Sequence, residues 1–301
     1  MSLSPAMPLL RGTVVLLVTL CVTTLVCIPL FSLGVVALIL PGAPGRQLRR
    51  WLEIWLFAWT GFNKFLLNAM RITDIRLDWR ELDTVSTDQW YLVISNHQTW
   101  SDILILQTIL WNRIPPIKFF TKEQLIWVPF IGIGMYLLGF PFVKRSTKQQ
   151  IAKKPELKGA DRESIRTACR QFREYPSTVL NFIEGTRFTP AKHERLRSPF
   201  NRLLPPKVGG LSYVITDMGS TFHRMLDVTI HYPSGTPTIW EFLQGKCRQV
   251  NVGVETYTIP AEVLAEGTER EQRRRLAAWI DTVWHAKDQC LKQLETGATA
   301  S

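Results

Sequence analysis

The sequence has few cysteines, and no two of them are spaced as a pair. Its five cysteines stand at positions 21, 27, 169, 247 and 290, and no C-x-x-C motif occurs. Zinc sites and disulfide frameworks both depend on cysteines at characteristic spacings. The sequence therefore predicts neither, and free thiols in a reducing compartment are expected.

Several common catalytic motifs are also missing. The chain contains no G-x-S-x-G elbow, no Walker-type glycine loop and no cluster of metal-ligand residues. A serine hydrolase, a P-loop enzyme and a metallohydrolase all lose support for this reason.

Acidic residues are outnumbered by basic ones, above all in residues 144–207. The formal net charge is +11, and this segment holds 16 Lys or Arg against 6 Asp or Glu. We expect an acidic partner, which can be nucleic acid, anionic lipid headgroups or a phosphorylated substrate. Nucleic acid is disfavoured, because the aromatic residues of the segment fall mostly at core positions and form no stacking platform.

Charged residues are absent from residues 12–40, a run of 29 mostly apolar positions. At about 1.5 Å per residue a straight helix of this length reaches roughly 43 Å, more than a hydrocarbon core of about 30 Å. We expect a membrane helix, tilted or bent at Pro29, or a helical hairpin, and not a cleaved signal peptide. Only Arg11 precedes the run whereas three arginines follow within residues 46–50, which predicts that the rest of the chain is cytoplasmic.

The chain divides at about residue 70 into an N-terminal membrane part, residues 1–70, and a folded domain, residues 71–301. Residues 51–70 are apolar and aromatic but carry Glu53 and Lys64, so an interfacial helix and a buried core helix both fit. Further along, we expect strands at residues 72–79, 90–95, 178–183, 226–231 and 249–257, and helices at residues 101–111, 161–175 and 269–294. This alternation predicts an α/β domain with a mixed, partly parallel sheet flanked by helices.

A titratable pair follows the strand predicted at residues 90–95. His97 stands where open α/β sheets place ligand groups, and Asp102 comes five residues later. The two side chains can meet only if His97 lies in the turn before the next helix, with Thr99 as the N-cap and Asp102 in the first turn. Asp102 would then orient His97 as a general base. A capping box beside a histidine without chemical function is the alternative.

Three further apolar runs end in polar residues. The first is GFPFVKR, which ends in Lys144 and Arg145. The second, TVLNFIEGTR, supplies Glu184, Gly185, Thr186 and Arg187, of which Gly185 permits a tight turn and the last two carry donors for phosphate. The third, LLPPKVGG, is a turn that contains Pro205 and Pro206.

These four blocks, in this order, resemble the glycerolipid acyltransferase family, which includes the PlsC-type lysophosphatidic acid acyltransferases. NHQTWSD is similar to the N-H-x-x-x-x-D block of the family, GFPFVKR to its arginine block, FIEGTR to its E-G-T-R block, and LLPPKVGG to its proline block. The resemblance covers residues 91–210 by motif and implies the family fold.

The resemblance also implies roles for these residues. His97 and Asp102 would be catalytic, Lys144, Arg145 and residues 184–187 would bind the acceptor phosphate, and Pro205 and Pro206 would shape the wall near the acyl group. The reaction implied is transfer of a fatty acyl group from acyl-CoA or acyl-carrier protein to 1-acylglycerol-3-phosphate at the bacterial inner membrane, without a cofactor or metal.

Alternatives remain at this point. Another lysophospholipid or an envelope polyol can be the acceptor, and a non-catalytic protein that binds anionic membrane lipid shares the same basic segment. Residues 118–142, rich in Ile, Leu and Gly, fit an acyl groove, a surface that rests on the membrane, or an ordinary core helix and turn.

Overall fold

A mixed sheet forms the centre of the computed structural model, which describes residues 6–40, 42–127, 131–138, 140, 142–143 and 160–296. The six strands are ordered β1-β8-β7-β2-β6-β3, and all neighbours are parallel except the antiparallel pair β7–β8. Their bounds are β1 Asp74–Asp78, β2 Tyr91–Ser95, β3 Ile117–Phe119, β6 Thr178–Asn181, β7 Arg224–His231 and β8 Gln249–Tyr257. The predicted mixed, partly parallel sheet is confirmed.

Helices cover both faces of this sheet, which explains why its strands are apolar on both sides. Along β2, Leu92 and Ile94 pack into one core cluster, whereas Tyr91 and Val93 pack into another. The first cluster is closed by α6 (Ala160–Phe172), α8 (Val208–Met218) and α11 (Glu269–Thr296). The second is closed chiefly by α3 (Ser101–Leu110) and α2 (Gly42–Ala69). Successive strand residues alternate between the two cores.

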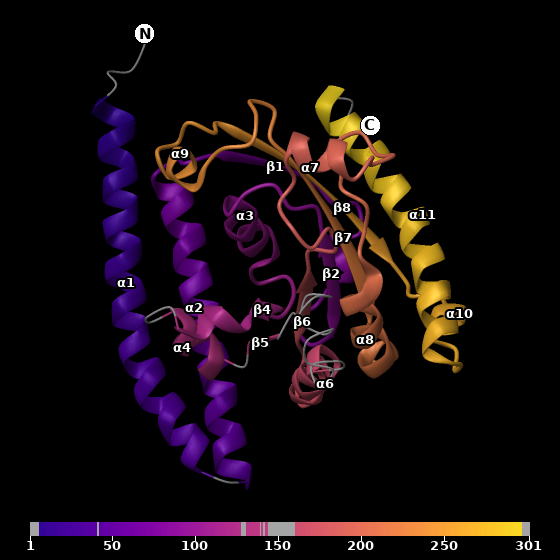
Figure 1. Cartoon of the computed structure of the whole chain (residues 1–301). Coiled ribbons are helices and arrows are strands. Elements are labelled where there is room, and N and C mark those ends of the chain that lie inside the picture. The colour runs from indigo at the N-terminus through magenta and orange to yellow at the C-terminus, as the bar shows by residue number, and fades with distance from the viewer. Residues whose placement is uncertain are drawn as a thin grey trace.

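Two long helices stand side by side at one edge of the molecule, on the opposite side from α11 (Figure 1). The first, α1, spans Ala6–Ile39 and continues through Pro29. Its stretch Met7–Ala37 is long and apolar enough to cross a membrane. Within this stretch, an 18-residue window has a mean hydropathy of 2.7, and only 17% of that window is buried. The helix α2 packs against α1, so the N-terminal part is a helical hairpin.

Residues 51–70 were expected to form either an interfacial helix or a buried core helix, and α2 has features of both. Leu52, Leu56 and Leu67 are buried, whereas Ile54 and Phe65 are 62% and 65% exposed. One side of α2 is therefore a core helix, and the other presents apolar side chains outward.

Residues 118–142 form several short elements in place of one helix and turn. These are the end of β3, β4 (Thr121–Lys122), η2 (Glu123–Trp127), α4 (Ile131–Leu137) and β5 (Phe142–Val143). The strands β4 and β5 pair in parallel as a second, small sheet. The glycines and the two prolines in the sequence of this segment favour short pieces over one long helix.

The remaining elements are short: η1 (Leu82–Thr84), α7 (Pro190–Arg195), α9 (Ile239–Leu243) and α10 (Ala261–Leu264). The predicted helix at residues 161–175 ends earlier, at Phe172, because Pro176 disfavours helical geometry in the residue before it. The predicted turn at residues 203–210 is partly wrong, since α8 begins at Val208 and includes Gly209 and Gly210. All five cysteines are free thiols.

Candidate active site

His97 lies in the turn between β2 and α3 and contacts Asp102, as the spacing predicts. Its Nδ1 atom is 2.9 Å from Oδ2 of Asp102, whose side chain is fully buried, while 15% of the His97 side chain is exposed. The ring of His97 stacks on Phe182 with the centroids 4.0 Å apart. Because Nδ1 faces the carboxylate, Nε2 is the nitrogen left to accept a proton.

Asp102 is held by four donors. Its Oδ2 accepts the backbone N–H groups of Gln98 and Thr99, at 2.6 and 2.9 Å, besides the contact with His97. Its Oδ1 accepts the hydroxyl of Tyr232 at 2.7 Å. Burial, and after it the charge of Asp102, raise the pKa of Tyr232, so this hydroxyl stays protonated and remains a donor. These four hydrogen bonds fix the position of the carboxylate.

The predicted N-cap at Thr99 is wrong. Trp100 occupies the N-cap position of α3 and makes no side-chain cap hydrogen bond. The hydroxyl of Thr99 donates instead to the carbonyl of Pro237, at 2.7 Å. The side chain of Asp102 already accepts the N–H of Thr99, so the first turn is closed by the carboxylate and the Thr99 hydroxyl is free to bond elsewhere.

Two residues that sequence reasoning missed anchor the His97 turn to β7. The amide of Asn96 donates to the carbonyl of Ile230 at 2.9 Å and accepts its N–H at 2.8 Å. Gln98 donates to the same carbonyl at 2.8 Å. A signal for Asn96 was present in the sequence, since an asparagine directly after a buried strand needs partners for both amide groups.

Glu184 ties the His97 turn to the proline segment. Its Oε1 accepts the N–H of His97 at 2.9 Å and its Oε2 accepts the N–H of Leu204 at 3.0 Å. The residue is 1% exposed. Burial raises the pKa of Glu184 to about 7, and the two backbone hydrogen bonds and the charge of Lys287 oppose this rise. The structure thus places Glu184 behind His97 as a bridge and not at the open surface with Arg187.

This raised pKa predicts a pH-dependent stability. Neutral Glu184 contributes stability that is complete below pH 4.5, its ordinary pKa, and is lost as the pH rises to about 7. The expected loss is about 3 kcal/mol in the free energy of unfolding. Glu184→Gln cannot ionise, so it should lack this part of the pH dependence, as urea unfolding of the detergent-solubilised protein would measure. Glu194→Gln, an exposed match, should retain it, and identical curves for all three proteins would contradict the assignment.

Cations gather around the turn at residues 184–187. Gly185 has φ +69°, which favours glycine, and its Cα faces Lys207, whose Nζ would lie 3.3 Å from any added Cβ. Lys192, which sequence reasoning missed, donates from Nζ to the hydroxyl of Thr186 and to the carbonyl of Arg187, both at 2.8 Å. Phosphate-sized anions near this turn would therefore meet two lysines.

Arg187 is exposed and lies over the ring of Trp100, with its guanidinium carbon 5.3 Å from the ring centroid. This cation–π contact directs the guanidinium toward the N-terminus of α3, three residues from His97. Arg187 is therefore close to the His97–Asp102 pair in space as well as in motif order.

The other predicted site residues divide into two groups. Pro205 and Pro206 are half-buried and lie between Leu204, which bonds Glu184, and Lys207, whose N–H donates to the carbonyl of Ile183 at 2.7 Å. Neither proline is among the residues that line the large apolar cavity described next. Lys144 and Arg145 lie outside the described residues.

A large apolar cavity of about 440 Å³ lies beside this site. Trp100, Ile103, Leu104 and Gln107 line it from one face of α3. The other lining residues are Thr23, Val26, Cys27 and Leu30 of α1, Trp55, Leu56 and Trp59 of α2, Phe119, Gly134, Met135, Leu138 and Phe140 of the segment 118–142, and Ile239. Since its walls are mostly hydrocarbon, the cavity suits an apolar chain.

A histidine–carboxylate pair, a cationic turn and an adjacent apolar cavity lie together on one mixed α/β sheet. In comparison with known proteins, a family model described as Acyltransferase matches residues 76–231, about half of the chain. This protein belongs to the acyltransferase family.

The named relatives are distant in sequence. The 1-acyl-sn-glycerol-3-phosphate acyltransferase gamma of Homo sapiens is 24% identical over 210 residues, 65% of this chain and 51% of that protein. The 1-acyl-sn-glycerol-3-phosphate acyltransferase alpha of Mus musculus is 34% identical over 80 residues, 27% of each chain. This chain thus spans about half the length of the gamma relative it matches.

A solved structure shares the fold. The crystal structure of the 1-acyl-sn-glycerophosphate (LPA) acyltransferase PlsC from Thermotoga maritima aligns with a TM-score of 0.54 and 17% sequence identity. The alignment covers 96% of this chain and 98% of that one, so it extends over the N-terminal hairpin as well as the sheet.

Proposed function

We propose that this protein is a membrane-anchored O-acyltransferase. It transfers a fatty acyl group from acyl-CoA or acyl-carrier protein to the free hydroxyl of 1-acylglycerol-3-phosphate, in phospholipid biosynthesis or remodelling. The observation that carries the proposal is the place of Trp100, which lines the apolar cavity and also contacts Arg187. If the acyl chain of the donor lies in the cavity and the phosphate of the acceptor lies at the cationic turn, the thioester and the acceptor hydroxyl meet near His97.

The geometry supports direct transfer. The acceptor hydroxyl gives its proton to Nε2 of His97 as its oxygen attacks the thioester carbonyl, and Asp102 stabilises the imidazolium that forms. When the tetrahedral intermediate collapses, the carbon–sulfur bond breaks and the thiolate takes the proton from His97. The products are an ester and a thiol, and no covalent enzyme intermediate is needed because a thioester is already activated.

The acceptor phosphate is assigned to the cationic turn. Arg187 offers a planar fork that can bind two phosphate oxygens, while Lys192 and Lys207 act as point charges beside Thr186 and Gly185. Lys144 and Arg145 keep their role in this proposal as predictions from the sequence.

The proposal locates the protein at the bacterial inner membrane with the catalytic domain on the cytoplasmic side. The apolar, mostly exposed window of α1 supports membrane attachment, and the arginines that follow it support the orientation. Anionic lipid at the membrane surface is the expected neighbour of the basic segment, and acyl-carrier protein is a second candidate donor.

Acyl transfer by the purified protein tests the proposal. Detergent-solubilised protein would be given a labelled acyl-CoA, or acyl-carrier protein, with 1-acylglycerol-3-phosphate, and phosphatidic acid is the expected product. If product forms only with another lysophospholipid or with a polyol, that molecule replaces 1-acylglycerol-3-phosphate as the proposed acceptor. Lack of transfer with every acceptor and both donors would favour a non-catalytic protein that binds anionic lipid.

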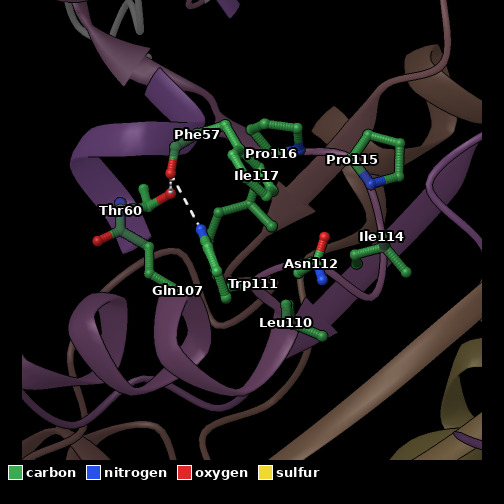
Figure 2. A pocket seen from close by; sticks show the side chains of 10 residues that line it. All are labelled: Phe57, Thr60, Gln107, Leu110, Trp111, Asn112, Ile114, Pro115, Pro116 and Ile117. Carbon is green, nitrogen blue, oxygen red and sulfur yellow. Dashed lines mark hydrogen bonds between the residues drawn. The ribbon is translucent and has the colours of Figure 1, made fainter. Parts of the chain in front are cut away.

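Gln107 is expected to limit which acyl chains fit. It lies two turns of α3, about 10 Å, from Trp100, so it stands at the far end of the cavity face of this helix. Its side chain is 7% exposed, and Oε1 has no hydrogen-bond partner among the described residues. It also lines a second cavity of about 20 Å³, where Figure 2 shows the amide extending toward Thr60 of α2. A hydrocarbon chain that passes Gln107 leaves this amide without a partner.

Gln107→Leu should therefore increase the use of longer acyl donors. Because the variant removes a buried amide oxygen that has no partner among the described residues, we expect the ratio of kcat/KM for hexadecanoyl-CoA to that for dodecanoyl-CoA to rise about fivefold. Competition between the two labelled donors would measure the ratio. Thr108→Val, in which the neighbouring buried hydroxyl that bonds Leu104 is removed, should leave the ratio unchanged. Equal ratios in the wild type and Gln107→Leu would refute the assignment.

A further inference from the structure

We propose that Tyr232 is a positioning residue for His97, and that it acts through the second carboxylate oxygen of Asp102. The inference rests on the proposed function in one respect, that His97 is the base of the reaction. Its structural part, that Tyr232 sets the proton affinity of His97, stands on the contacts alone.

The hydroxyl of Tyr232 completes the hydrogen bonding of Asp102. Three donors, from His97, Gln98 and Thr99, share Oδ2. Within the described part of the chain, Oδ1 has one donor, the Tyr232 hydroxyl at 2.7 Å. Asp102 is 0% and Tyr232 2% exposed, so water has little access to this bond. Donors at both oxygens fix the rotation of the carboxylate about its Cβ–Cγ bond.

Tyr232 is itself rigidly mounted. It follows His231, the last residue of β7, and its ring packs in the core cluster that contains Val228 and Ile230. The His97 turn is joined to the same stretch, because Asn96 and Gln98 bond Ile230. The distance between the Tyr232 hydroxyl and the carboxylate is therefore set by the sheet and not by a mobile loop.

The bond affects the proton that His97 binds during the reaction. A hydrogen bond from Tyr232 spreads part of the carboxylate charge onto Oδ1. Without this donor, Asp102 attracts a proton on His97 more strongly, and His97 becomes available as a base only at higher pH. The Tyr232 hydroxyl thus limits how strongly Asp102 attracts the proton on His97, so that His97 can both accept and release it.

Other titratable groups surround the pair and remain unchanged in a Tyr232 variant. Glu184 accepts the N–H of His97, and burial raises its pKa to about 7. The charge of Lys287, from α11, acts on Glu184, and the thiol of Cys247 adds to the effects that raise the pKa of Tyr232. A difference in the pH midpoint of His97 between the Tyr232 variant and the wild type is therefore caused by the loss of the Tyr232 hydroxyl.

The test compares Tyr232→Phe with the wild type in the full-length, detergent-solubilised protein. The phenylalanine ring fills the same space, and a melting curve checks the fold. Diethyl pyrocarbonate acylates unprotonated histidine, so its rate of reaction at Nε2 of His97, followed by peptide mass spectrometry, gives a pH midpoint without turnover. We expect the midpoint in Tyr232→Phe to be higher by about half a pH unit or more, and kcat to be about tenfold lower.

Tyr213→Phe is the matched control, because Tyr213 is a half-buried tyrosine on α8 that lies outside the site. It should keep the wild-type midpoint and rate. An unchanged midpoint in Tyr232→Phe would overturn the inference, even if kcat fell, since a smaller folded fraction lowers the rate without moving the midpoint. A raised midpoint in a protein with no acyl transfer would support the positioning role and reject the proposed function.

Discussion

Replacement of His97 by alanine is expected to lower kcat for acyl transfer by a factor of about 10² to 10⁴, the usual contribution of a positioned general base. The reason is the geometry of the pair: Nδ1 is bonded to a buried carboxylate, and Nε2 is the ring nitrogen left to accept the acceptor's proton. The KM for the acyl donor should change little, because the apolar cavity is intact. Initial rates with labelled acyl-CoA would measure both constants.

His285→Ala is a suitable control for this change. His285 lies on α11, and its side chain is 63% exposed beside Asp281. Its loss removes an imidazole without touching the site, so full activity is expected. Full activity of a folded, membrane-associated His97→Ala protein would instead remove the basis of the proposed mechanism.

Lys287→Met is expected to lower the free energy of unfolding by about 3 to 5 kcal/mol, the usual effect of breaking a buried ion pair. Lys287 of α11 lies 2.8 Å from Asp227 of β7, and neither side chain is more than 1% exposed. Lys287 also donates to the carbonyl of Val228 and to the hydroxyl of Thr229. The variant leaves Asp227 buried without its cation, and burial already raises the pKa of this carboxyl. Urea unfolding in detergent would measure the loss.

Two comparisons make this prediction specific. Lys292→Met breaks a pair with Asp288 on the same helix, in which the lysine is 46% and the aspartate 8% exposed, and it should cost about 1 kcal/mol. The double variant Asp227→Leu with Lys287→Met removes both charges and should recover much of the lost stability. A double variant as unstable as Lys287→Met alone would show that the ion pair is not the cause.

The pattern of the sequence predicted the parallel part of the sheet well, because strands such as β2 and β6 are short apolar runs between polar turns. It also predicted how His97 and Asp102 can meet. Their side chains point apart on a continuous helix, so His97 has to lie in the turn before α3 and Asp102 in its first turn. The Thr99 cap failed because local spacing cannot show that Pro237, far away in the chain, competes for the hydroxyl.

The other omissions are side-chain contacts that the sequence pattern does not show. Tyr232 contacts Asp102 from the end of β7, 130 residues further along the chain, and Lys192 of α7 contacts Thr186, six residues before it. Glu184 was assigned to the phosphate side by its place in the motif, whereas its side chain turns inward to the N–H groups of His97 and Leu204. The direction of a side chain after a strand depends on neighbours that no local pattern contains.

The helix α1 is a wall of the apolar cavity as well as an apolar hairpin arm. Thr23, Val26, Cys27 and Leu30 line the cavity, and Leu25 and Ile28 on the same turns are 61% and 60% exposed. A truncated protein that begins after residue 40 would therefore open the cavity along one side and expose its hydrocarbon lining to solvent. Removal of α1 to make the protein more soluble is expected to weaken binding of the acyl chain. Preparations used to study substrates should therefore keep the intact hairpin.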